Sequence, residues 1–331
     1  MRFKDLLLAT LIPALLLANS CAVEPETETY ASQDRVMKAW MRHNYPGVST
    51  YSGTNLYVID LQPGDGPAIT DSAYVWAHYV KRSLDGNILS TNSQQLSEQL
   101  GTYAVSNYYG SSIWRVDQGY LPDELEKVIK SMRSGSSARI AMPVSASTHE
   151  FSMYSAFSGT SESSNEVIDL TIDTVMTNVF TYQESVMKDW FSRHYQVSDT
   201  AALHLYFKKL SEAESETDTI SDGSNVSVRY IGRLLNGQVF DTNIEDTAKF
   251  YRIWKESGSY NALTVAYYKD EEQRKDNNSV VEGFAKALLM MNYGDTAVTV
   301  FGPQLGYGEK GSSPGIPEYA PLCFWLYIEP K

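Results

Sequence analysis

Basic residues are scarce in this chain, and their scarcity excludes one class of partner. There are 27 Lys and Arg against 40 Asp and Glu, which gives a formal net charge of -13 at pH 7. Nucleic-acid binding draws much of its affinity from clustered Lys and Arg, which release counterions from the phosphates. The sequence holds no basic stripe of this kind. We therefore expect no nucleic-acid partner.

Cysteine and histidine are too few to predict a disulfide framework or a metal centre. The two cysteines are Cys21 and Cys323, and the second lies in an apolar segment. A buried, inert thiol is the simplest interpretation of Cys323, and a disulfide to Cys21 in an oxidising compartment is the alternative. The five histidines stand singly, without the spacing of metal ligands. We expect neither a metal nor a cofactor.

Long apolar runs are missing beyond the N-terminal segment. There, two basic residues precede an apolar run over residues 6–18, which is too short for a spanning helix. The pattern indicates a secretory signal peptide over residues 1–20. The small residues before Cys21 resemble the bacterial lipobox, although Ala18 stands where that motif usually has Leu. The resemblance implies lipid attachment to Cys21 and a place in the cell envelope, on the periplasmic or surface face of a bacterial membrane.

The segment that follows Cys21 has the composition of a linker. Residues 21–32 are polar and acidic and include Pro25. Such a segment buries too little apolar surface to fold alone. We predict a lipid-anchored tether here, with folded structure beginning near Gln33.

The rest of the chain is an internal duplication. The sequence QDRVMKAW, which begins at Gln33, returns as QESVMKDW from Gln183, an offset of 150 residues. Residues 86–92 and 237–243 form a second pair at nearly the same offset, and both end in Thr-Asn. A chain of 331 residues has room for two domains of ordinary size. We therefore predict two related domains.

Each copy has the pattern of an α+β domain, and we place the two domains at residues 33–178 and 179–331. In the second, Phe284, Leu288 and Met291 recur at the spacing of a buried helix face. Short apolar segments that read as strands lie on both sides of this helix. The pattern predicts one helix packed on an antiparallel sheet in each domain.

A variable excursion interrupts each copy, over residues 93–120 and 244–279. In the second excursion the residues around Tyr251 predict a short amphipathic helix. Residues 269–278 are strongly charged and predict a solvated turn.

The second copy resembles the FKBP-type peptidyl-prolyl cis-trans isomerases over residues 203–329. The matching motifs follow in family order: VRYIGRLLNGQVFD from Val228, VVEGF from Val280, Gly294-Asp295, LGYG from Leu305, Ile316-Pro317 and LCF from Leu322. The resemblance implies an antiparallel half-barrel sheet wrapped around one helix, and hence two tandem FKBP-like domains in the chain.

The resemblance also implies an apolar site for a proline ring. Phe284 is its floor, at a position where the family usually has Trp. Three further aromatic residues would form its walls: Tyr230, Phe240 and Phe324.

The same resemblance implies a polar edge and a covering loop. Val281 would offer its backbone N–H to the peptide, Tyr307 would offer its hydroxyl to a substrate carbonyl, and Asp241 would supply a carboxylate. Ile316 would line the loop that leans over the site. Leu263 is the candidate for a further wall residue from the excursion.

Catalysis by such a site needs no nucleophile. Rotation about an amide is opposed by about 18–20 kcal/mol of resonance, and X-Pro bonds populate both isomers. An apolar cup removes water from the imide carbonyl and so favours the twisted, less polar state. We interpret the protein as an isomerase that acts on proline-containing or apolar extended segments of exported proteins. The alternative is a lipoprotein that binds peptides, or acts as a chaperone, without turnover.

The first copy has lost most of these residues. Tyr79 is kept, but Leu-Ser stands at residues 89–90 in place of Phe-Asp, and Leu125 replaces the floor aromatic. Pro122 has no N–H to match the expected donor of the second copy. We interpret this domain as a fold without catalysis, used for packing, spacing or binding a partner.

Overall fold

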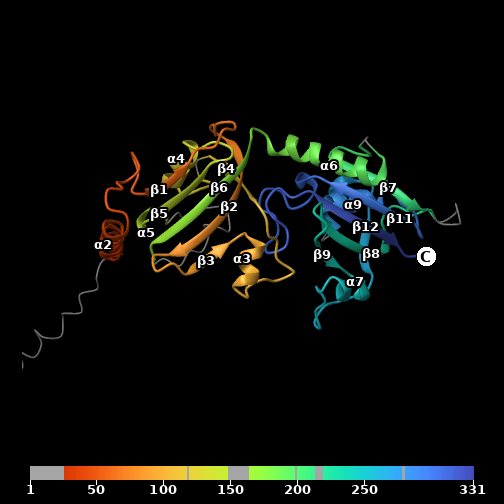
Figure 1. Cartoon of the computed structure of the whole chain (residues 1–331). Helices are drawn as coiled ribbons and strands as arrows, with labels where there is room; N and C mark the ends of the chain where they lie inside the picture. Colours follow the sequence, from red (N-terminus) through yellow and green to blue (C-terminus); the bar gives the residue numbers. More distant parts are fainter. Residues whose placement is uncertain (1–25, 118, 148–163, 198–199, 213–218, 278–279) are drawn as a thin grey trace, which may run out of the picture.

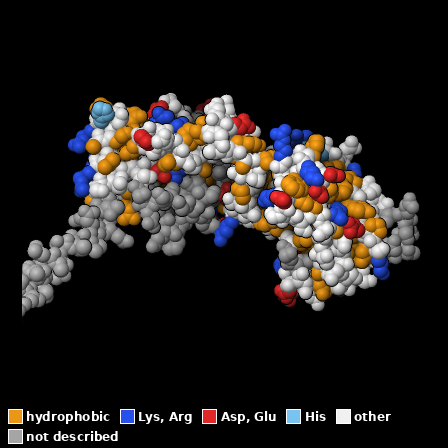
Figure 2. All heavy atoms as spheres, turned by 90° about the horizontal axis from the view of Figure 1, so that it is seen from below, with side chains coloured by type: hydrophobic (Ala, Val, Ile, Leu, Met, Phe, Trp, Pro, Cys, Tyr) orange, Lys and Arg blue, Asp and Glu red, His pale blue; other side chains and the backbone are white. Residues whose placement is uncertain are grey.

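The computed structural model describes residues 26–117, 119–147, 164–197, 200–212, 219–277 and 280–331. They form two antiparallel six-stranded sheets that lie side by side, with a long helix leading from the first to the second (Figure 1). We call residues 26–176 the N-terminal unit and residues 179–331 the C-terminal unit. Figure 2 shows them from below as two lobes. The predicted signal peptide and Cys21 lie outside the described residues.

The N-terminal sheet has the strand order β1-β5-β6-β2-β3, and β4 pairs with β2. The elements of this unit are, in chain order, α2 (Glu26–Asn44), β1 (Tyr57–Gln62), β2 (Ala73–Ser83), β3 (Ile88–Thr91), α3 (Gln94–Gln99), β4 (Ser112–Val116), α4 (Asp123–Lys130), β5 (Ser137–Met142), α5 (Val144–Ser147) and β6 (Glu166–Met176).

The C-terminal sheet has the order β10-β8-β12-β11-β7, and β9 pairs with β8. Its unit contains α6 (Val179–Tyr195), β7 (Leu205–Ser211), β8 (Ser224–Leu234), β9 (Val239–Thr242), α7 (Glu245–Phe250), β10 (Leu263–Tyr267), α8 (Glu271–Asn277), α9 (Glu282–Leu288), β11 (Thr296–Phe301), a 3-10 turn (Pro303–Leu305) and β12 (Leu322–Ile328). Strand for strand, the two sheets have the same connections. The predicted α+β class, with an antiparallel sheet and a packed helix in each copy, is confirmed.

The leading helix of each unit covers the outer face of its sheet in the same way. Trp40 of α2 donates its indole N–H to the Leu84 carbonyl at 2.9 Å. Trp190 of α6 donates to the Leu235 carbonyl at the same distance. The duplication seen in the sequence therefore extends to single hydrogen bonds.

Helix α2 corrects one expectation. It begins at Glu26, so that residues 26–32 of the predicted tether are helical. Further along the helix Met37 and Met41 are buried, whereas Val36 is 50% exposed. Residues at i and i+4 share one face of a helix, so Met37 and Met41 determine which face of α2 packs against the sheet.

The second excursion corrects another expectation. The helix predicted near Tyr251 is present as α7. Residues 269–278, expected as a solvated turn, contain α8 instead. Arg274 of this helix is 3% exposed and forms an ion pair with Glu282 at 2.7 Å. Because Glu282 neutralises the guanidinium, a strongly charged segment packs against the body of the unit.

The remaining cysteine lies in the layer between α6 and its sheet. Cys323 is buried and has no disulfide in the described part of the chain. Burial raises the pKa of its thiol to about 12, so the group stays protonated at neutral pH, as predicted for an inert thiol. Among the described residues, no helix has the length and apolar character needed to cross a bilayer.

Candidate active site

Four aromatic residues that lie far apart in the sequence meet in the core of the C-terminal unit. Phe284 of α9 and Phe324 of β12 meet edge to face, with ring centroids 5.2 Å apart. Tyr230 of β8 lies 5.7 Å from Phe284, and Phe240 of β9 lies 5.7 Å from Phe324. The structure thus brings the predicted floor and all three predicted walls into one aromatic cluster, which we call the aromatic cup.

Two glycines allow these rings to pack so closely. A Cβ atom on Gly232 of β8 would lie 2.7–2.8 Å from the rings of Phe240 and Phe324. Gly283 of α9 is needed in the same way, since its Cβ would lie 2.3 Å from the Phe301 ring. Phe301 stacks beneath Phe324 at 5.7 Å. This supporting ring was missed in the sequence, where it reads as an ordinary apolar strand residue.

The polar edge of the cup is formed by two tyrosines and one aspartate. The Tyr230 hydroxyl donates to an Asp241 carboxylate oxygen at 2.7 Å. Burial raises the pKa of both Tyr230 and Tyr307; the hydrogen bond to Asp241 raises the pKa of Tyr230 further, and the Asp241 charge raises that of Tyr307. Both phenols therefore keep their protons at neutral pH. Tyr307 is 42% exposed, so its hydroxyl is available to donate to a carbonyl that enters the cup.

Val281 and Ile316 both belong to the core that holds the aromatic rings. Val281 directly precedes α9 in an extended conformation. Among the described residues its N–H has no backbone acceptor, as is usual for the first donors of a helix. Ile316 is buried against the same core as Phe284. Leu263, in β10, packs against this core too.

A buried asparagine fixes the strand that carries Tyr230, and we did not predict it. The Asn243 side chain accepts from the Tyr230 N–H at 2.9 Å and donates to the Val228 carbonyl at 2.8 Å. Asn92 makes the same two contacts, with the Tyr79 N–H and the Ala77 carbonyl. The Thr-Asn pair shared by both copies was the signal for this device.

The N-terminal unit has an ion pair where the C-terminal unit has its cup. Lys81 pairs with Ile168 and Ser90 across the sheet, just as Gly232 pairs with Phe324 and Asp241. The Lys81 ammonium lies 2.8 Å from the Glu166 carboxylate, and both side chains are almost fully buried.

The helix of the N-terminal unit agrees with the predicted losses. Leu125 is fully buried at the floor position. Pro122 takes the place before α4 that Val281 takes before α9. The first copy therefore offers neither an aromatic floor nor the matching backbone donor.

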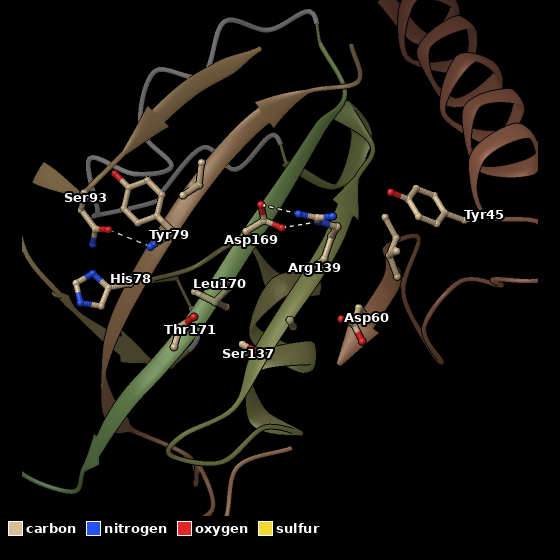
Figure 3. Close-up of a pocket in the computed structure, with 14 residues that line it drawn as sticks. Tyr45, Asp60, His78, Tyr79, Ser93, Ser137, Arg139, Asp169, Leu170 and Thr171 are labelled. Carbon is tan, nitrogen blue, oxygen red and sulfur yellow. Dashed lines mark hydrogen bonds and ion pairs between the residues drawn. The ribbon is translucent and has the colours of Figure 1, made fainter. Parts of the chain in front are cut away.

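A separate cleft of about 660 Å³ crosses the N-terminal sheet (Figure 3). It runs over β2, β6 and β5 toward Tyr45. Two of its charged groups are paired with each other, since Arg139 contacts Asp169 at 2.5 Å. Asn92, which also lines it, is bound to the Tyr79 N–H. Among the described residues, no group of three His, Cys, Asp or Glu side chains is placed to hold a metal.

Comparisons with known proteins concern the unit that carries the cup. Residues 216–328 match the family model for FKBP-type peptidyl-prolyl cis-trans isomerases. The chain is 29% identical over 123 residues to a probable FKBP-type peptidyl-prolyl cis-trans isomerase of Haemophilus influenzae, covering 36% of this chain and 42% of that protein. It is 30% identical over 117 residues to the peptidyl-prolyl cis-trans isomerase Mip of Coxiella burnetii, covering 35% and 40%.

Among solved structures, the three FKBP domains of wheat FKBP73 align with 83% of this chain and 94% of that chain, at 19% identity and a TM-score of 0.29. The family match and the aromatic cup together define the C-terminal unit as containing an FKBP-type isomerase domain. The matches span less than half of either bacterial relative.

Proposed function

We propose that the C-terminal unit is a peptidyl-prolyl cis-trans isomerase that assists the folding of exported proteins. The observation that carries this proposal is the aromatic cup, in which Tyr230, Phe284 and Phe324 meet beside the Asp241 carboxylate. The cup lies inside the segment that matches the FKBP family model. Its ligand would be an extended segment with a proline next to apolar residues.

The chemistry follows from the surroundings of the X-Pro bond. A proline ring on Phe284 would be enclosed by aromatic side chains, and water would leave the imide carbonyl. The twisted imide is less polar than the planar one, so a dry site stabilises it selectively. The Tyr307 hydroxyl and the Val281 N–H would bind carbonyls of the flanking chain and hold it while the bond rotates.

We propose further that Cys21 carries a lipid that holds the protein at a bacterial envelope membrane, where exported chains emerge. The support is the signal-like segment and the small residues before Cys21. A Cys21→Ser chain expressed in bacteria should leave the membrane fraction and take up no labelled fatty acid. Continued fatty-acid labelling of that variant would contradict the lipid site.

The isomerase proposal is tested by following cis-trans exchange of a Leu-Pro tetrapeptide by NMR with the full chain and no protease. We expect catalysed exchange, with kcat/KM reduced about tenfold in Tyr307→Phe, the loss expected for one hydrogen bond in the transition state. Asp241→Asn should also reduce kcat/KM. Asp246→Asn, on the exposed face of α7, is the matched control and should leave kcat/KM unchanged. An exchange rate equal to the uncatalysed one would reject the proposal.

Peptide binding without turnover is the second candidate. It is favoured by Phe284, a smaller floor than the Trp usual in the family, and by the exposure of Tyr307. It predicts binding of Leu-Pro peptides and slower aggregation of an unfolded protein while exchange stays at the uncatalysed rate. Failure to bind any such peptide would exclude it.

A further inference from the structure

The loop before β12 is fixed by the other unit of the chain. We call residues 310–320 the rim loop and residues 104–109, which follow α3, the contact segment. The rim loop folds back on itself through two hydrogen bonds between Ser312 and Ile316, at 2.8 and 2.9 Å. Figure 1 shows the chain after α3 and the loop before β12 meeting between the two sheets. The tip of the rim loop is thus held against the N-terminal unit.

At the tip, the backbone of the contact segment is hydrogen-bonded to the backbone of the rim loop. The Tyr108 N–H donates to the Pro314 carbonyl at 2.8 Å. The Gln238 side chain, in the turn before β9, donates to the Asn107 carbonyl at 3.0 Å. The Tyr108 ring packs against the core cluster that contains Phe284, Ile316 and Phe324. The contact segment, which belongs to the N-terminal unit, therefore packs against the core of the C-terminal unit.

Gly315 shows how close this contact is. A Cβ atom on Gly315 would lie 2.8 Å from the Ser106 carbonyl oxygen, whereas its nearest neighbour within the C-terminal unit, Phe240 Cβ, is 3.7 Å away. A methyl group is therefore tolerated by the C-terminal unit and excluded by the contact segment.

The base of the rim loop is anchored by Tyr319. This side chain is fully buried, and its ring meets Tyr74 of β2 edge to face at 5.3 Å and Phe180 of α6 at 5.9 Å. Its backbone has φ of +55°, a conformation that a bulky residue adopts only where its surroundings fix it. Ile316 lies between this anchor and the tip.

We propose that the N-terminal unit is a positioning element for the isomerase site: the contact segment and the ring contact between Tyr74 and Tyr319 hold the rim loop, and with it Ile316, over the aromatic cup. The inference rests on the proposed function and deepens it. It gives the N-terminal unit, which has no aromatic cup of its own, a role in the site of the C-terminal unit. Preorganising the loop lowers the ordering cost of peptide binding, so the contact should act on KM, while the floor and the walls that act on the twisted bond are untouched.

The test compares the full chain with Gly315→Ala, which clashes with the contact segment, and Tyr108→Ala, which removes its ring. Ser313→Ala, at an exposed residue of the same loop, is the matched control. In the first two variants we expect hydrogen exchange over residues 310–320 to be about tenfold faster than in the native chain. We also expect KM for a Leu-Pro peptide to rise about three- to tenfold with kcat within about twofold. Ser313→Ala should behave like the native chain.

Three results would overturn the inference. Equal hydrogen-exchange rates over residues 310–320 in the native chain and the three variants would show that the contact does not hold the loop. A lower KM in Gly315→Ala would show that the contact segment obstructs the site. A fall in kcat at constant KM would place the effect on the bond rotation itself. A native chain without isomerase activity would reject the proposed function separately, and the exchange rates together with peptide Kd would still decide the positioning role.

Discussion

The two units place different chemistry at matching positions of the same sheet. In the C-terminal unit, Gly232 leaves room for two aromatic rings, and an apolar cup results. In the N-terminal unit, Lys81 occupies the equivalent place and pairs with the buried Glu166. One backbone thus supports either an apolar cluster or an ion pair, and the choice is made by a few side chains on the buried face of the sheet. A duplicated domain can therefore keep the fold of its sister domain without keeping its functional site.

Removing one partner of the ion pair should have the largest effect. Lys81→Met leaves the Glu166 carboxylate buried without its partner, and we expect a loss of about 3–5 kcal/mol in the free energy of unfolding. The double variant Lys81→Met/Glu166→Leu should recover most of that loss, because it replaces both charges by apolar groups. Urea denaturation of the full chain, followed by tryptophan fluorescence, measures both.

An exposed pair in the other unit is the control for this experiment. Lys249 and Glu245 are 53% and 50% exposed and lie 2.7 Å apart. Lys249→Met should cost much less than Lys81→Met, because water solvates both charges of an exposed pair. If Lys81→Met costs no more than Lys249→Met, the pair does not take the structural place of the cup.

The two buried asparagines test whether the copies differ in site or only in stability. Asn243→Ala and Asn92→Ala each leave a strand N–H and a carbonyl without their side-chain partner. We expect a loss of about 1–3 kcal/mol in each variant. Asn243→Ala should also reduce kcat/KM for a Leu-Pro peptide, because it releases the strand that carries Tyr230. Equal activity of the two variants would contradict this difference.

The aromatic residues of the site could be predicted from the sequence, because their positions follow from local pattern and from the spacing of the family motifs. Phe284 on the helix, and Tyr230 and Phe324 on neighbouring strands, fall at positions that a half-barrel brings together. The sequence did not predict the pair Lys81 and Glu166, because each reads as an ordinary surface residue until the strands are in register. Helix α8 was missed for a related reason, since Arg274 meets its partner Glu282 only in the folded unit. Contacts between the two copies, such as that of Tyr319, have no sequence signal at all.

The smallest of the predicted effects concerns the place where the two copies meet. Glu318 of the rim loop lines a cleft with Tyr79, Tyr108 and Lys310. Burial raises the pKa of its carboxyl group above the ordinary value of 4.5. After burial, its charge is the second cause of the raised pKa of both Tyr79 and Tyr108. The folded chain therefore holds this proton more tightly than the unfolded chain does.

The sign of the resulting pH dependence is fixed by linkage. At a pH below the ordinary carboxyl pKa, the folded and the unfolded chain both keep the Glu318 proton, and the free energy of unfolding is unchanged. As the pH rises from there through the pKa of the folded state, the unfolded chain releases its proton first, and stability falls. Glu318→Gln stays neutral, so its gain in unfolding free energy over the native chain should be near zero at pH 4 and greatest at pH 7. The exposed Glu256, changed to Gln, should show no such trend. A gain of equal size at both pH values would mean that Glu318 acts through its shape and not through its charge, and that the meeting point of the two copies is not sensitive to pH.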